Sequence, residues 1–244
     1  MNCITGFVGA VPTAHREAFI RHTEIAAAAF HDHGLSSAVE CWGDDVPEGK
    51  LTSFRKAVLA EPDETVIFSW YRWPSKTAEE AGMRAAMADP RLSPEQNPMP
   101  FDGKRVIWGS FAPMLELGGE RPGGYVDGFV IPIPKAARGE FEAFAHFCDP
   151  IFMEHGAIWI MEAWESDVPD GKLTDFRRAV AAQPDEAIVF SWVQWPDRTA
   201  RDAGNARVMA DPRFSTMICP FDMTRMIVGG FVPVCQSGVE QKVS

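Results

Sequence analysis

The stretch Val39-Glu-Cys-Trp-Gly-Asp-Asp-Val-Pro-Glu-Gly-Lys50 occurs twice in this sequence, the second time as Met161-Glu-Ala-Trp-Glu-Ser-Asp-Val-Pro-Asp-Gly-Lys172. Its tryptophans, at positions 42 and 164, are 122 residues apart, which is half the length of the 244-residue chain. Self-similarity at a fixed period is the sequence signature of a repeated structural unit. The stretch therefore predicts two copies of one fold, a first unit at residues 1–117 and a second at residues 125–244.

Around the repeated stretch, each copy has the pattern strand, helix, strand, strand, helix, strand. In the first copy we expect strands at residues 4–11, 65–73 and 105–113, a long helix over 13–33, and a strand that runs into the quoted stretch. The long helix has an apolar stripe at three- and four-residue steps, and the strands are rich in β-branched and aromatic residues. In the second copy, Pro150 is expected to kink or split the long helix. This order of elements favours the ferredoxin-like fold, a four-stranded antiparallel sheet with helices on one face.

The third strand of each copy indicates how the copies pack. Residues 65–73 and their counterparts 187–195 are apolar on both faces, although a ferredoxin-like unit would leave one face of its sheet bare. Packing the two bare faces together buries both. Residues 118–124, Gly-Gly-Glu-Arg-Pro-Gly-Gly, are typical of a linker and keep the copies at a high effective concentration. We therefore predict an α+β chain of two tandem ferredoxin-like βαββαβ repeats, packed sheet to sheet as a barrel within one chain.

Several ordered motifs resemble those of the YbaA-like bacterial family. Both copies contain Glu-x-Trp followed by Asp-x-Pro-x-Gly-Lys, then Thr-x-Phe-Arg, Phe-Ser-Trp with Trp-Pro, Met-Ala-Asp-Pro-Arg and Pro-Phe-Asp. The resemblance covers nearly the whole chain, twice. It implies membership of the dimeric α/β-barrel superfamily, with the usual homodimer joined into one polypeptide. That superfamily also contains cofactor-independent monooxygenases, haem-degrading and chlorite-decomposing haem proteins, and small-lactone isomerases.

Charge and composition argue against several classes of partner. Asp and Glu outnumber Lys and Arg, 34 to 23, and the formal net charge is −11, whereas nucleic-acid binding needs a concentrated cationic surface. No apolar run approaches the ~20 residues of a membrane span, and the N-terminus lacks the features of a signal peptide. The five cysteines lack the spacing of a zinc site or a paired disulfide. We expect a cytoplasmic protein with no nucleic-acid or membrane partner, no metal and no cofactor.

Glu40 and Glu162 are the first catalytic candidates. Each lies two residues before a tryptophan, so on a strand the carboxyl group and the indole share one face. In the barrel lumen, burial would raise the pKa of this carboxyl group and suit it to proton transfer near neutral pH. The alternative is a structural glutamate at a strand edge, paired with Arg72, Arg105 or Arg225.

Asp127 is the third catalytic candidate. It lies on the first strand of the second copy, where the first copy has Thr5, so a site that needs this carboxylate occurs at most once per chain. The tryptophans could line an aromatic pocket, with core packing as the alternative. The expected ligand-binding residues are Trp42, Trp70, Trp73, Trp164, Trp192, Trp195, Arg105 and Arg225. Lys50 and Lys172 sit in a turn, where local hydrogen bonding explains them equally well.

Two functions from different classes follow. The first is the binding or transformation of a small apolar or aromatic molecule in the barrel, of the cofactor-independent monooxygenase or isomerase type that the resemblance implies. The second is a non-catalytic stress-related or scaffold protein whose twinned residues seal the barrel. The chain is expected to be an internal pseudo-dimer in either case, and a further homodimer of whole chains stays open.

Overall fold

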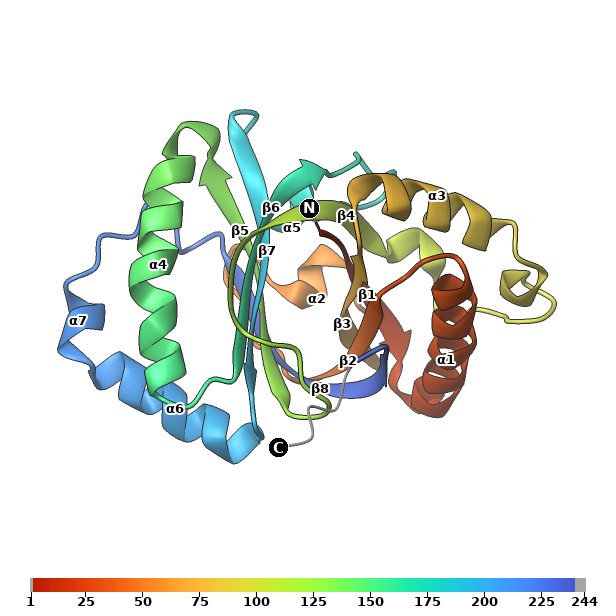
Figure 1. The fold of residues 1–244 in the computed structure, drawn as a ribbon, viewed down its shortest axis with the longest axis horizontal. Coiled ribbons are helices and arrows are strands. Elements are labelled where there is room, and N and C mark those ends of the chain that lie inside the picture. Colours follow the sequence, from red (N-terminus) through yellow and green to blue (C-terminus); the bar gives the residue numbers. More distant parts are fainter. Residues whose placement is uncertain (1, 240–244) are drawn as a thin grey trace.

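The computed structural model describes residues 2–239 and contains one closed antiparallel barrel of eight strands, in the order β1-β3-β2-β8-β5-β7-β6-β4 (Figure 1). The first half of the chain supplies β4-β1-β3-β2, and the second half supplies β8-β5-β7-β6. Both orders are those of a ferredoxin-like sheet. The prediction of two tandem ferredoxin-like repeats in one intrachain barrel is confirmed.

The two repeats contain the same succession of strands and helices. The first repeat comprises β1 (Cys3–Pro12), η1 (Thr13–His15), α1 (Arg16–Asp32), β2 (Ser37–Asp45), α2 (Phe54–Ala57), β3 (Glu64–Trp73), α3 (Lys76–Met87), η2 (Pro90–Leu92), η3 (Gly103–Arg105) and β4 (Ile107–Gly118). The second comprises β5 (Tyr125–Pro134), η4 (Lys135–Ala137), α4 (Arg138–Glu154), β6 (Trp159–Asp167), α5 (Phe176–Ala179), β7 (Glu186–Trp195), α6 (Arg198–Ala210), α7 (Pro212–Ser215) and β8 (Ile227–Ser237).

Backbone pairing joins the two repeats at both seams of the barrel. Strand β2 pairs with β8, and β4 pairs with β6, each antiparallel and each with a shift in register along its length. The last strand of the first repeat is longer than the expected 105–113, because its second half pairs with the other repeat, for example Leu115 with Glu162. The extension therefore depends on a partner that is distant in the sequence.

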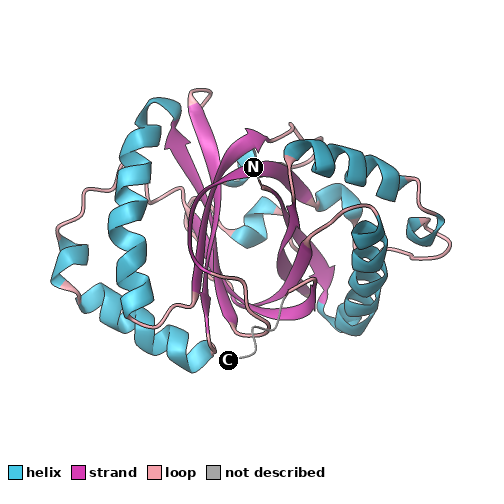
Figure 2. Cartoon of the chain, in the orientation of Figure 1, coloured by secondary structure: helices cyan, strands magenta, loops and turns pink. Residues whose placement is uncertain are grey.

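Helices cover the outer face of the barrel on both sides, α1 and α3 over the first repeat and α4 and α6 over the second (Figures 1 and 2). Both long helices end at a histidine followed by glycine in the left-handed region, Gly34 with φ 96° and Gly156 with φ 109°, as expected for this cap. Of the two outcomes expected at Pro150, a kink or a split, the split is wrong, because α4 continues through the proline. Buried Cys148 and Ile151 hold the helix against the sheet on either side of the proline. Within residues 2–239, no helix is long and apolar enough to cross a bilayer.

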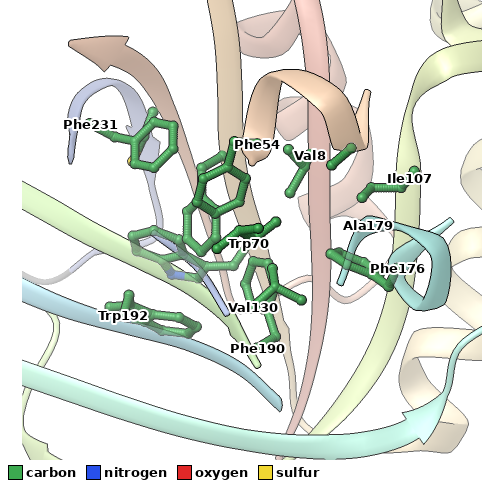
Figure 3. Close-up of a cluster of buried hydrophobic side chains, with 14 of the residues drawn as sticks. Val8, Phe54, Trp70, Ile107, Val130, Phe176, Ala179, Phe190, Trp192 and Phe231 are labelled. Atoms are coloured by element: carbon green, nitrogen blue, oxygen red, sulfur yellow. The ribbon is translucent and has the colours of Figure 1, made fainter. Parts of the chain in front are cut away.

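Aromatic rings from both repeats fill the barrel lumen (Figure 3). Phe68 stacks on Phe190 with ring centroids 4.5 Å apart, and Trp70 stacks on Trp192 at 4.4 Å. Phe54 and Phe176, from the short helices α2 and α5, add to the same cluster. The lumen is therefore a packed core, and the expected ligand pocket inside it is wrong.

Glycines on the first strand of each repeat make this packing sterically feasible. A Cβ at Gly6 would lie 3.0 Å from the ring of Phe190, and a Cβ at Gly128 would lie 2.9 Å from the ring of Phe68. Real Cβ atoms essentially never show the shorter of these contacts, and the other is tighter than nine in ten real Cβ contacts. A side chain at either position would therefore press on a stacked ring.

Candidate functional site

Glu40 lies on the outer, helix-covered face of the barrel. Trp70 points into the lumen (Figure 3), so its neighbours Ser69 and Tyr71 point outward, because side chains alternate along a strand. Both donate to the Glu40 carboxylate, Tyr71 Oη to Oε1 at 2.9 Å and Ser69 Oγ to Oε2. Trp42 shares this face and packs against α1. The expectation that the Glu-x-Trp pair faces the lumen is therefore wrong. The side chains that face the lumen belong to the positions next to this pair along the strand, because adjacent residues point to opposite faces.

A cavity of ≈ 480 Å³ lies over this face of the first repeat. Its walls come from the sheet, from α1 and α3, and from the segment that connects α3 to β4. Glu40 is the single carboxylate among the described residues that line it, with His22, Thr23, Tyr71 and Asn97 as the other polar side chains. The remaining lining residues are Phe7, Phe19, Ala26, Phe30, Ile67, Met83, Met87, Leu92, Pro94, Met99, Phe101, Gly103, Val106 and Trp108.

Burial governs the acidity of Glu40. The residue is 5% exposed, and desolvation raises the pKa of its carboxyl group to about 7, while the hydrogen bonds from Ser69 and Tyr71 act in the opposite direction. All three candidate arginines are engaged elsewhere, Arg225 with Glu186. Arg72 binds Glu116 through both terminal nitrogens, at 2.8 and 2.7 Å, and Arg105 is paired with Glu64. The structural alternative in which an arginine neutralises Glu40 is therefore wrong.

His22 is held in a defined tautomer beside the cavity. Asn97 donates from Nδ2 to the His22 carbonyl at 3.0 Å, which turns its Oδ1 toward the ring, 2.9 Å from Nδ1. Nδ1 therefore carries the proton, and Nε2 is the acceptor nitrogen of the neutral ring. Burial lowers the pKa of His22, so the ring is neutral at pH 7. Residues 22 and 97 are far apart in the sequence, and His22 occurs in one copy alone, which is why motif comparison missed it.

The second repeat keeps the glutamate and loses most of its polar surroundings. At the positions of His22 and Tyr71 it has Phe144 and Val193. Glu162 accepts one hydrogen bond, from Ser191 Oγ at 2.7 Å, and its Oε2 has no partner among the described residues. Asp149 of α4, which replaces an alanine of the first repeat, lies close enough to raise the pKa of Glu162. The second repeat therefore buries two carboxyl groups where the first has an isolated one.

Replacing Asp149 by asparagine is expected to raise the free energy of unfolding at about pH 8 by roughly 1–3 kcal/mol. Burial first, and then the charge of Asp149, raise the pKa of Glu162 well above 4.5, and burial also raises the pKa of Asp149. The folded protein therefore keeps protons that the unfolded chain has released, so stability falls as the pH rises from ~4 to above ~7. Urea unfolding between about pH 5 and pH 8 measures this decline, which should be shallower in the variant. Part of it remains, because burial still raises the pKa of Glu162 and that of Glu40.

The control for this prediction is Glu142→Gln, which removes an exposed carboxylate from the same helix. It should keep the pH profile of the wild type. A profile of Asp149→Asn that declines as steeply as that of the wild type would contradict the mutual destabilisation of the two carboxyl groups.

Asp127 connects the sheet to α6. It accepts hydrogen bonds from Arg201 Nε at 2.8 Å and from Trp195 Nε1 at 3.0 Å. In the first repeat the strand and the helix exchange the roles of acceptor and donor. There the carboxylate, Glu79, belongs to the helix, and Thr5 of the strand donates to it at 2.6 Å. Asp127 is thus ion-paired at a helix–sheet junction, and it is not among the residues that line the cavity of the first repeat.

The structure separates the other expected ligand-binding residues. Trp70 and Trp192 lie in the lumen, whereas the remaining four tryptophans of the set pack under the helices of their own repeats. Arg105 binds the Glu64 carboxylate at 2.6 and 2.7 Å, and Arg225 binds Glu186 through two contacts of 2.6 Å. The cavity wall instead contains Trp108, which sequence reasoning did not select. Among residues 2–239, no group of three or more His, Cys, Asp or Glu side chains could hold a metal ion.

Comparison with known proteins gives a family and a fold. The model of the family described as "Protein of unknown function (DUF1428)" matches residues 2–103 and 124–223. The uncharacterized protein YbaA of Escherichia coli (strain K12) is 49% identical over 109 residues, which are 44% of this chain and 93% of YbaA. These matches confirm the resemblance inferred from the sequence motifs.

Two solved structures share the barrel at low sequence identity. A Fusobacterium nucleatum subsp. nucleatum protein provisionally described as a monooxygenase aligns with a TM-score of 0.57 and 10% identity, over 96% of this chain and 93% of its own. An "anthrone oxidase-like protein" aligns with a TM-score of 0.52 and 12% identity, over 99% of this chain and 95% of its own. At these identities the similarity concerns the fold alone.

Proposed function

This chain belongs to the DUF1428 family of proteins of unknown function, and we propose from its cavity that it binds a small apolar or aromatic molecule from which Glu40 removes a proton. The proposal rests on one observation: a carboxyl group with a pKa of about 7 and no cationic partner lines an otherwise largely apolar cavity of ≈ 480 Å³. A general base is most effective when its pKa lies near the working pH. A cavity of this size and polarity also fits the usual ligand sites of proteins.

The polar groups around Glu40 have separable roles in this proposal. Ser69 and Tyr71 hold the carboxylate in place and stabilise its charged form, which is the form that accepts a proton. His22 presents the lone pair of Nε2 and would accept a hydrogen bond from a hydroxyl group of the ligand. The apolar walls exclude water, which strengthens these interactions.

Two reaction types begin with this proton transfer. Return of the proton to another carbon of the resulting carbanion is an isomerisation and needs no further reactant. Reaction of the carbanion with O₂ as co-substrate converts a methylene group to a carbonyl group and releases one water molecule, which is an oxygenation without a cofactor. The names of the two structural relatives, a monooxygenase and an anthrone oxidase-like protein, favour the second type for this chain.

Proton exchange under nitrogen tests the shared first step. Anthrone, an aromatic ketone with a weakly acidic methylene group, is incubated with the protein in deuterated buffer, and proton NMR follows the loss of the methylene signal. We expect exchange faster than in buffer alone, with a rate that rises as the pH passes through about 7, because the unprotonated form of Glu40 is the base. Exchange at the rate of buffer across this pH range would refute Glu40 as a general base toward such ligands.

The packed lumen favours a second candidate function, that of a non-catalytic stress-related or scaffold protein. Stacked aromatic rings seal the barrel, as that function requires. Under this alternative Glu40 contributes to stability alone, and its removal would change unfolding and no reaction.

We also propose a cytoplasmic location, since the five cysteines carry free thiols, which suit a reducing compartment. A further homodimer of whole chains stays a prediction.

A further inference from the structure

We propose that the ligand of the Glu40 cavity carries a carboxylate group, which Lys104 and Lys172 bind in a second hollow on the other side of Trp108. This inference rests on the proposed function and names the chemical class of its ligand: an apolar or aromatic body with an anionic end.

The second hollow adjoins the Glu40 cavity. It has a volume of ≈ 640 Å³ and is lined by the start of β4 and by residues 169–175 of the second repeat. Val106 and Trp108 line both spaces. Trp108 is 41% exposed although it is a large apolar side chain, so its indole forms a common wall that a ligand could cover on passing from one space to the other.

The two lysines make this hollow different in charge from the Glu40 cavity. Lys104 and Lys172 both line it, and neither Nζ has a hydrogen-bonding or ion-pair partner within residues 2–239. Of the two acids in the same wall, Asp175 is paired with Arg178 at 3.1 Å, and Asp170 is unpaired among the described residues. The local balance is therefore cationic, in a chain whose net charge is −11.

The turn that carries Lys172 is fixed against the first repeat. A Cβ at Gly171 would lie 1.9 Å from the Thr174 carbonyl oxygen, so the tight turn needs glycine. Gly171 N donates to Asp175 Oδ2 at 3.1 Å, and the Thr174 hydroxyl donates to the carbonyl oxygen of Ala57, across the boundary between the repeats. The Asp-x-Pro-x-Gly-Lys motif thus places a lysine backbone at a defined position beside η3.

The other copy of this motif lacks the matching partners. The turn of Lys50 also contacts the opposite repeat, where Thr52 Oγ1 donates to the Arg225 carbonyl at 3.0 Å. At the positions of Lys104 and Trp108, however, the second repeat has Thr224 and Val228. The lysine pair and the exposed indole therefore occur together on the side of the Glu40 cavity.

Electrostatics sets the orientation of such a ligand. An anionic end beside the buried Glu40 carboxyl would disfavour the charged form of both groups, whereas two ammonium groups stabilise a carboxylate with charge-assisted hydrogen bonds. The apolar body would accordingly lie against Glu40, with the carboxylate turned toward the lysines.

Calorimetric titration with 6-phenylhexanoate and its neutral amide, 6-phenylhexanamide, tests this inference at low salt. We expect the wild type to bind the acid roughly ten-fold more tightly than the amide, as a charge-assisted contact provides. The double variant Lys104→Met, Lys172→Met should lose this preference and bind the amide as the wild type does, which also shows that it is folded. Lys50→Met, the matched control from the other copy, should keep the preference.

Three results would overturn the inference. A wild type that binds the amide and shows no preference for the acid refutes the anionic end and leaves the apolar cavity of the proposed function standing. A preference that survives the double variant refutes the lysines. Failure to bind either probe refutes the lysine site together with the cavity on which it rests.

Discussion

Glu40→Gln is expected to slow the deuterium exchange of anthrone by about 10²–10⁴-fold, the range by which a positioned general base contributes. Glutamine has nearly the same shape and keeps an oxygen that can accept a hydrogen bond from Ser69 or Tyr71, but it cannot take up the proton. The same substitution should leave the free energy of unfolding unchanged or raise it above pH 7. Burial raises the pKa of Glu40 to about 7. Ionisation of this group therefore lowers the free energy of unfolding once the pH exceeds the ordinary pKa of a glutamate.

The pseudo-symmetric substitution Glu162→Gln identifies the active repeat. Glu162 lacks the hydrogen bond that Tyr71 provides to Glu40, and Phe144 stands at the position of His22. We therefore expect this variant to keep the exchange rate of the wild type. Equal losses of rate in both variants would contradict a site confined to the first repeat. A loss of stability in Glu40→Gln without a change in rate would favour the non-catalytic function.

Phe190→Ala is expected to lower the free energy of unfolding by about 3–5 kcal/mol, the usual cost of deleting a buried aromatic ring. Phe190 is fully buried in the lumen, stacked on Phe68 at 4.5 Å and on Phe111 at 5.2 Å, with Phe176 edge-on at 5.7 Å. Since these rings come from both repeats, their contacts hold the two halves together as well as fill the core. Urea unfolding at neutral pH measures the loss.

Phe147→Ala is the matched control, because this ring on α4 is 48% exposed. It should change the free energy of unfolding by less than about 0.5 kcal/mol. A cost below roughly 1 kcal/mol for Phe190→Ala would mean that the lumen is loosely filled, and the expected ligand site in the barrel would then have to be reconsidered.

The position of the candidate site shows the limit of strand periodicity as a guide. Alternation places Glu40 and Trp42 on one face of β2, and the structure agrees with that. Alternation does not show whether that face points into the lumen or toward the helices. Both faces of this sheet are covered, one by the other repeat and one by helices. The side chains that point into the lumen are those on the opposite face of the strands. They include Phe68 and Trp70 on β3, whose rings stack on their counterparts in the second repeat.

The polar residues of the cavity show a second limit. His22 and Asn97 meet only because the segment after α3 folds back onto α1. Comparison of the two copies selects residues that both share, and a site present in one copy is invisible to it. A histidine and a threonine within an apolar helical stripe, at positions 22 and 23, were the local signal that could have indicated a cavity under α1.

The sequence by itself determined the duplication, the order of strands and helices in each repeat, and the closure of two sheets into one barrel. These features follow from the local sequence pattern and from the need to bury apolar faces, and both can be recognised in the sequence. Only the tertiary structure decided which face of each strand meets the lumen, how far β4 extends, and where the carboxylates lie. The physical reason is that these outcomes depend on contacts between segments far apart in the sequence. A periodic pattern shows which side chains share a face of a strand or helix, but it does not show which other segment packs against that face.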